Sequence, residues 1–247
     1  MERSKIIDVL QRWILRIAPF VAFPFALASL AAIFFWVPTD KNLGLSQRIF
    51  YWHVPSATAC FLVFGIAGLA SAVYLRTRRI DWDHAAHAAV SVGMVFATMV
   101  IGTGSIWAHT AWGAWWTWDS RLTTFLVLWL VYASYLLLRI FARDNEMAPR
   151  YAAVLAIVGA TNVPLVMMAT RLFRTIHPQV IANPKGGIDD PRMVAALLLS
   201  FAAYLALVLW LWALKLAQLR TAGRIEMLEG DRHADERHEL AARSHRP

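Results

Sequence analysis

Four tryptophans lie within seven residues of the segment WGAWWTWDSR, at positions 112–121. An indole ring is a broad flat surface, and aromatic pairs gain about 0.5–1.5 kcal/mol beyond the burial of their area. If the segment is helical, residues at i, i+3, i+4 and i+7 share one face, namely Trp112, Trp115, Trp116 and Asp119. Trp118 completes the cluster. The pattern favours equally an aromatic belt at a membrane boundary and a docking surface for a wide planar ligand.

Two histidines lie in short motifs that could serve the same surface. His53 stands in YWHVPSA and His177 in RTIHPQV. A single loop histidine is usually a solvated side chain, but two imidazoles flanking an aromatic surface indicate the paired axial ligands of an iron porphyrin. His109, in the stretch AHTAW, is a further candidate that could replace either ligand. The pair therefore predicts an axial ligand set for haem iron.

Four arginines at the ends of apolar segments could bind the propionates of such a haem, because a guanidinium pairs bidentately with a carboxylate. They are Arg48, Arg121, Arg171 and Arg174. Extension of the charged head towards water is the alternative explanation for each of them. Asp119 could hold Arg121 or a tryptophan N–H in place without contacting the ligand. The cofactor that fits the complete set is haem b, iron protoporphyrin IX.

The elements that position these residues are predicted to be six transmembrane helices. Hydrophobic residues make up 59% of the 247-residue chain, and they form long uninterrupted runs, as is typical of a membrane protein. A hydrocarbon core of about 30 Å needs roughly 20 apolar residues in a helix. Six runs have this length, at about 18–37, 54–75, 88–107, 122–139, 151–170 and 193–214. The predicted fold class is an all-α, polytopic membrane protein.

Lysine and arginine are distributed unevenly between the connections of these helices. Seventeen of the 24 lie in the N-terminal segment, the second and fourth connections and the C-terminal segment, and seven lie in the other three connections. Cytoplasmic loops are enriched in these residues. Both termini are therefore predicted to be cytoplasmic, with the tryptophan cluster, His53 and His177 on the outer side.

Three regions follow from this topology. Residues 1–17 carry apolar residues at helical spacing among basic ones, which predicts a short amphipathic helix on the cytoplasmic leaflet. Residues 18–215 form the six-helix membrane domain, with the outward tryptophan-rich segment at about 108–121. Residues 216–247 form a charged cytoplasmic tail, expected as a frayed helix or a disordered segment.

Several functions are disfavoured by the composition. Cys60 is the only cysteine, so the sequence contains no CxxC redox pair and no CxxCH haem-attachment motif. It also lacks a phosphate-binding P-loop, so an ATP-driven step would require a partner. The net charge of +8 is explained by membrane orientation, without a nucleic-acid partner. No ionisable residue lies near the midplane of a predicted helix, which argues against proton coupling. Ligand binding and transfer, and no enzymatic reaction, is the predicted activity.

The segment TGSIWAHTAWGAWWTWDSRLT, residues 103–123, resembles the tryptophan-rich WWD signature, WGxWWxWDxRLT, of membrane proteins that handle haem in cytochrome c maturation. Every specified position of the signature is present. With six predicted helices and a histidine in the first and third outward connections, the chain resembles the CcmC-type haem exporter protein C family over nearly its whole length. It departs from the family around the second histidine, where RLFRTIHPQ replaces the usual aromatic pair before Thr-Leu-His.

The resemblance implies a protein of the inner (cytoplasmic) membrane that holds haem at the periplasmic face and delivers it to the membrane-anchored haem chaperone CcmE. It implies as further partners the ATPase and permease subunits CcmA and CcmB, the small membrane subunit CcmD and the lipid bilayer. The platform for haem and chaperone would comprise Trp112, Trp115, Trp116, Trp118 and Asp119, with His53 and His177 as axial ligands. Two other classes stay open, a b-type cytochrome-like electron-transfer subunit and a haem-free permease or scaffold subunit.

Overall fold

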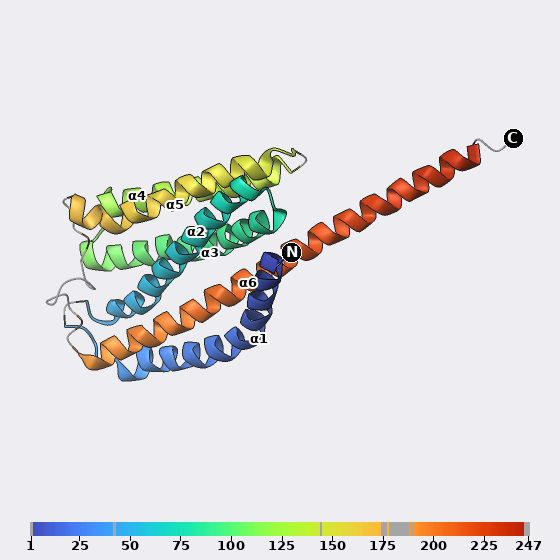
Figure 1. Cartoon of the computed structure of the whole chain (residues 1–247). Helices are drawn as coiled ribbons and strands as arrows, with labels where there is room; N and C mark the ends of the chain where they lie inside the picture. The colour runs from blue at the N-terminus through green and yellow to red at the C-terminus, as the bar shows by residue number, and fades with distance from the viewer. Residues whose placement is uncertain are drawn as a thin grey trace.

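A computed structural model of the chain describes residues 2–41, 43–143, 145–173, 177, 188 and 190–244, with side chains placed for residues 9, 11–230 and 232 within those ranges. Six α-helices follow one another along the described residues (Figure 1): α1 (Glu2–Ala31), α2 (Phe50–Thr77), α3 (Ile80–Trp112), α4 (Ser120–Phe141), α5 (Ala148–Leu172) and α6 (Pro191–Ser244). A π-helix, η1 (Ala32–Trp36), extends α1, and a 3-10 helix, η2 (Leu45–Ile49), precedes α2.

Six helical spans are long and apolar enough to cross a membrane, which confirms the predicted all-α membrane fold. All of these spans begin before the apolar runs identified in the sequence, three of them by seven to nine residues and three by two or three. They are Gln11–Trp36, Leu45–Thr77, Ile80–Trp112, Ser120–Phe141, Ala148–Leu172 and Pro191–Gly230. The difference arises because polar residues at the ends of the runs continue the same helices. Within the described residues the β-structure is limited to an isolated bridge between Asp40 and Gly44.

Both terminal segments are continuous with membrane-spanning helices. Residues 2–17, predicted as a separate amphipathic helix, form the first part of α1. Pro19 and Pro24 lie inside α1, and each removes a backbone donor from the helix, in keeping with the bend of α1 in Figure 1. At the other end, α6 continues to Ser244, so the tail is helical as far as that residue. Its alanine, leucine, glutamate and arginine residues all favour helix.

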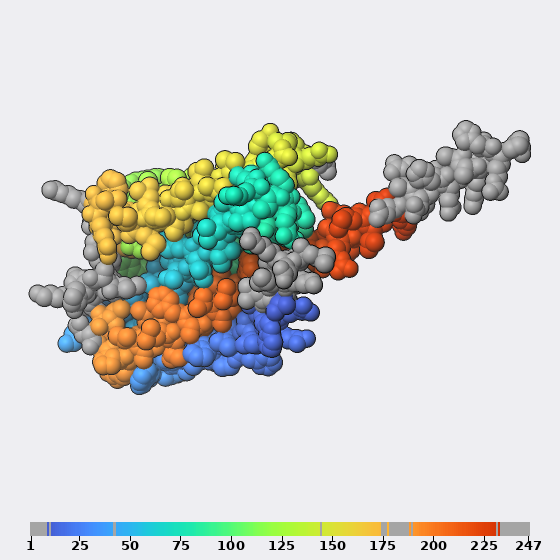
Figure 2. Space-filling view, viewed as in Figure 1, coloured from blue at the N-terminus to red at the C-terminus, as the bar shows by residue number. Residues whose placement is uncertain are grey.

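The six helices are arranged in two layers, one of four helices and one of two. Helices α2, α3, α4 and α5 pack together, α6 packs against α2 and α3, and α1 packs against α6 (Figure 1). The space-filling view shows α6 extending beyond the rest of the molecule at the end where the N-terminus lies (Figure 2). Both ends of the chain are therefore at one end of the bundle, as an even number of spans requires.

In the layer of four helices, small residues and a stacked aromatic pair join α2, α4 and α5. The rings of Phe64 and Tyr132 stack with centroids 3.8 Å apart, and the Tyr132 hydroxyl lies 3.1 Å from the carbonyl oxygen of Ala156. An added Cβ at Gly159 would lie 2.6 Å from the Tyr132 ring, so only glycine allows this approach. Small residues let helices approach closely in a membrane, where apolar burial alone gives little driving force.

A buried ion pair joins the first turn of α3 to the last turn of α4, at the end of the bundle where the chain termini lie. The Arg139 guanidinium donates to both carboxylate oxygens of Asp83, each at 2.9 Å. The Asp83 side chain is almost fully buried, so the charge is compensated by a bidentate partner, as buried charges require. This contact lies at the opposite end of α3 from the tryptophan cluster, and the two features are separated by the length of the helix.

Candidate functional site

A cavity of about 360 Å³ lies at the end of the bundle opposite the termini, where α2 and α4 begin and α3 and α5 end. Its volume falls within the range of small-molecule sites, about 300–1,000 Å³. The lining combines aromatic, apolar and basic side chains from four helices and two connections. It consists of Phe50, His53, Val54, Ala57, Thr58, Phe61, Val100, Ile101, Gly104, Ser105, Trp107, Ala108, Trp112, Trp115, Trp116, Arg121, Leu122, Phe125, Met167, Thr170, Arg171 and His177.

The tryptophan segment is a non-helical connection between α3 and α4, so the condition for a shared helical face is not met. Helix α3 ends at Trp112, because Gly113 adopts the left-handed conformation with φ 71° and its N–H donates to the carbonyl oxygen of His109 at 3.0 Å. Glycine at this position is a common helix C-terminus, since it has no Cβ to clash. Residues 113–119 then connect α3 to α4 without helical structure. Trp112, Trp115, Trp116 and Asp119 therefore do not share one helical face.

Three of the four clustered indoles nevertheless line the same cavity. Trp112, Trp115 and Trp116 are lining residues. Trp118 is 77% exposed and is not one of them, although its ring meets that of Trp116 edge-on at 5.9 Å. The lining also includes Trp107, whose ring meets that of Trp112 edge-on at 5.1 Å. Trp107 is not among the site residues predicted from the sequence, although it lies five residues before Trp112 in the same segment.

Asp119 fixes the start of α4 and with it the position of Arg121. Its carboxylate accepts hydrogen bonds from the backbone N–H of Arg121 at 2.9 Å and of Leu122 at 3.3 Å. This is the usual arrangement of an N-cap aspartate, whose negative charge also suits the helix N-terminus. Asp119 does not line the cavity, whereas Arg121 does. The structure thus gives Asp119 a supporting contact with Arg121, through the backbone.

His53 lies in the first turn of α2 and faces α3. Its Nδ1 is 3.0 Å from the hydroxyl oxygen of Thr103. The ring also lies against the backbone of α3 at Gly104, where an added Cβ would be 3.0 Å from His53 Cε1. His53 is a lining residue, so its imidazole is held by α3 on one side and borders the cavity on the other.

His177 reaches the same cavity from the connection between α5 and α6. Its ring centroid is 5.9 Å from that of Trp112 and 6.4 Å from that of Trp107. Burial lowers the pKa of His177 to about 3, and the nearby charges of Arg121 and His53 act in the same direction, opposed by Asp119. The imidazole is therefore neutral at physiological pH. A neutral imidazole is the form that binds a metal.

The basic residues divide into those that line the cavity and those that do not. Arg121 and Arg171 are lining residues. Arg48 is not, and its guanidinium carbon lies 5.7 Å from the centre of the Phe34 ring. Arg174 lies outside the described residues. Two guanidinium groups thus remain as candidate partners for carboxylates of a ligand in the cavity.

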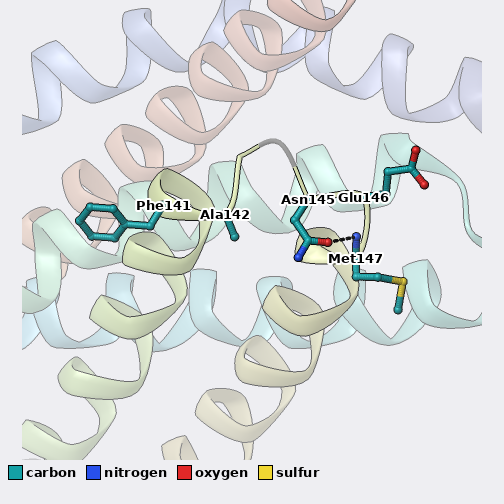
Figure 3. A pocket seen from close by; sticks show the side chains of 5 residues that line it. All are labelled: Phe141, Ala142, Asn145, Glu146 and Met147. Carbon is teal, nitrogen blue, oxygen red and sulfur yellow. Dashed lines mark hydrogen bonds between the residues drawn. The ribbon is translucent and has the colours of Figure 1, made fainter.

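Two other features lie outside the cavity. The exposed ring of His109 stacks on that of Trp115, with centroids 4.2 Å apart, and His109 is not a lining residue. A shallow pocket between α4 and α5 is shown in Figure 3, where Asn145 Oδ1 accepts from the Met147 N–H at 2.8 Å. Its five lining residues, Phe141, Ala142, Asn145, Glu146 and Met147, include no imidazole or indole. Of these two pockets, the cavity at the end of the bundle is the one lined by imidazole and indole side chains.

The fold and the cavity define a class of protein, a six-span helical membrane protein with two imidazoles and several indoles around one cavity at the end of the bundle. The chain belongs to the CcmC family, heme exporter protein C, whose model matches residues 2–230. The heme exporter protein C of Bradyrhizobium diazoefficiens is 34% identical over 201 residues, 80% of this chain and 76% of that protein.

Two further relatives extend this comparison. The heme exporter protein C of Escherichia coli is 31% identical over 186 residues, which are 75% of each chain. A putative cytochrome c biosynthesis ccmC-like mitochondrial protein of Marchantia polymorpha is 28% identical over 170 residues, 68% of this chain and 72% of that protein. The similarity thus covers most of the length of each protein.

Proposed function

We propose that this chain binds haem for cytochrome c maturation, with His53 and His177 as the two axial ligands of the iron of haem b. The observation that carries the proposal is that these two imidazoles, from the start of α2 and from the connection after α5, line one cavity together with Trp112, Trp115 and Trp116. Membership of the heme exporter protein C family supports the same role.

The lining offers a partner for each chemical part of haem. Two imidazole nitrogens can bind the iron, and indoles can stack on the planar macrocycle. Arg121 and Arg171 can pair with the propionates, since guanidinium groups bind carboxylates bidentately. The side chains further into the helices, such as Phe61, Val100 and Phe125, are apolar and suit the hydrocarbon edge of the ring. The chain would hold and release haem without catalysing a reaction on it.

The site would lie at the periplasmic face of the inner membrane, and its haem would pass to the chaperone CcmE. The concentration of lysine and arginine at the opposite end of the bundle supports this orientation. Trp115, which lines the cavity, and the neighbouring Trp118, which does not, are 59% and 77% exposed, so a docking chaperone could contact both indole rings. The ATPase and permease subunits CcmA and CcmB and the small membrane subunit CcmD would be its other partners, and any ATP-driven step would come from the ATPase.

Absorption spectra of the detergent-purified chain, oxidised and reduced, test the haem site. The wild type should show a low-spin spectrum with two histidine ligands. His53→Ala and His177→Ala should each change the spectrum or reduce the haem content, and the double variant should lose the bound haem. A colourless wild type would favour a haem-free permease or scaffold subunit, and four identical haem spectra would overturn His53 and His177 as the ligands.

Co-purification tests the contact with the chaperone. Trp115→Ala combined with Trp116→Ala should remove CcmE from the purified complex, because the substitution deletes two indoles at the cavity. Trp13→Ala is the matched control, since Trp13 is also an exposed indole but lies on α1. Recovery of CcmE with the double variant at the wild-type yield would contradict a docking role for these rings.

A further inference from the structure

The hydrogen bond between His53 and Thr103 joins the candidate ligand on α2 to a residue of α3. The His53 Nδ1 and the Thr103 Oγ1 are 3.0 Å apart. Thr103 Oγ1 is also 2.6 Å from the carbonyl oxygen of Met99. The carbonyl can only accept a hydrogen bond, and a hydroxyl group has a single hydrogen to donate. The threonine hydroxyl therefore donates to Met99 and has lone pairs left for its second partner.

These two contacts determine which nitrogen of His53 carries the proton. If the Thr103 hydroxyl donates to Met99, it must accept from His53, so Nδ1 carries the hydrogen. A neutral imidazole has one protonated nitrogen, and the other then has a lone pair. The lone pair is consequently on Nε2, the nitrogen that does not contact Thr103. Ligating histidines commonly donate their second ring N–H in this way, which fixes both tautomer and ring orientation.

The backbone of α3 also restricts the space around Cε1 of the same ring. At Gly104, the residue after Thr103, an added Cβ would lie 3.0 Å from His53 Cε1 and 3.5 Å from Nδ1. Consecutive residues of one helix thus provide the hydrogen bond and the surface against which the imidazole lies. Thr103 itself is not a lining residue, so its effect on a bound ligand would pass through His53.

We propose that Thr103 is a positioning residue for haem binding, which holds His53 as the Nδ1–H tautomer and so leaves the lone pair of Nε2 for the iron. This inference rests on the proposed function, because it concerns the geometry of one axial ligand of the haem. The contact also raises the basicity of the ligand, since an imidazole that donates a hydrogen bond from Nδ1 gives more electron density to the metal.

The test is a titration of the purified apoprotein with haemin, together with the reduction potential of the bound haem. Thr103→Val keeps a branched side chain of similar shape and removes the hydroxyl. It should weaken haemin binding about 10- to 100-fold and raise the reduction potential, because a less basic ligand stabilises the oxidised iron less. Thr103→Ser retains the hydroxyl and should restore both values to within about twofold of the wild type.

Two further variants separate positioning from a general effect on α3. Thr110→Val removes a hydroxyl that donates to the Trp107 carbonyl oxygen on the same helix and should leave both values unchanged. In a His53→Ala background, Thr103→Val should have no additional effect, because its contact has already been lost.

The outcomes distinguish this inference from the proposed function. Low-spin haem in the wild type, with equal affinity and potential in Thr103→Val, would overturn the role of Thr103 and leave the haem site intact. An equal loss of affinity in Thr103→Val with and without His53 would also overturn it, because the effect would not pass through the imidazole. A wild type that binds no haemin would overturn both.

Discussion

At the residue scale, the site depends on how closely a ring on α2 approaches the backbone of α3. Gly104→Ala would place a Cβ 3.0 Å from His53 Cε1, so the imidazole must shift by a few tenths of an ångström. We expect weaker haemin binding, by about tenfold, because small displacements of a ligand are costly at a preorganised site. Gly102→Ala is the control, since an added Cβ there meets nothing within 4 Å. Equal haemin affinity of the two variants would show that the approach at Gly104 is unimportant.

Burial of His177 in the folded protein disfavours the protonated form of its imidazole. Its pKa is lowered from 6.5 to about 3, mainly by burial and secondly by the charge of Arg121. Folding therefore disfavours the protonated ring, and the stability of the apoprotein should fall as the pH drops from 6.5 towards 3. At pH 5 the folded protein should still contain neutral His177. NMR spectra of histidine-labelled protein, assigned with His177→Ala, can detect this, and a midpoint near 6.5 for His177 would contradict it.

At the scale of the elements, the connection between α3 and α4 is fixed at both ends by residues whose roles can be recognised in the sequence. Gly113 ends α3 and Asp119 begins α4, and glycine after an apolar run and aspartate before one are known stop and start signals. The spacing of the tryptophans would give a shared face only if one helix continued through both positions. The periodicity of the tryptophans shows which residues would share a face in a continuous helix. Gly113 and Asp119 determine that the helix is interrupted.

The start of α4 should depend measurably on its cap. Asp119→Ala removes the acceptor for the Arg121 and Leu122 N–H groups, which typically costs about 1 kcal/mol. Hydrogen exchange at these two amides should accelerate about fivefold, whereas Asp119→Asn should exchange nearly as the wild type does. Asp190→Ala is a matched control, since Asp190 accepts from the Arg192 N–H near the start of α6. Exchange at the α4 amides that is equally fast in both alanine variants would argue against a local capping role.

The six helices could be predicted from the sequence because each apolar run has the length of a membrane crossing. The site could be predicted in part, because His53, His177 and three of the tryptophans occur in recognisable motifs and the structure brings them to one cavity. Their roles towards haem stay predictions. The contact between His53 and Thr103 could not be predicted, because it depends on the rotation of α2 against α3. No property of either residue alone specifies that rotation.

At the scale of the whole molecule, the function of the cavity depends on which side of the membrane it faces. Cysteine labelling can test this, because Cys60 is the only native cysteine and is 0% exposed. Leu45 on η2 is 63% exposed at the cavity end, and Leu228 on α6 is 67% exposed at the other end. The distribution of lysine and arginine predicts that an impermeant maleimide reaches Leu45→Cys from the periplasm.

The same reagent should reach Leu228→Cys only after the inner membrane is opened. The chain with Cys60 alone should stay unlabelled in both conditions, which controls for reaction with the buried native thiol. The reverse pattern would place the indoles, His53 and His177 on the cytoplasmic side. Haem would then be bound before it crosses the membrane, and a periplasmic chaperone could not receive it directly from this cavity.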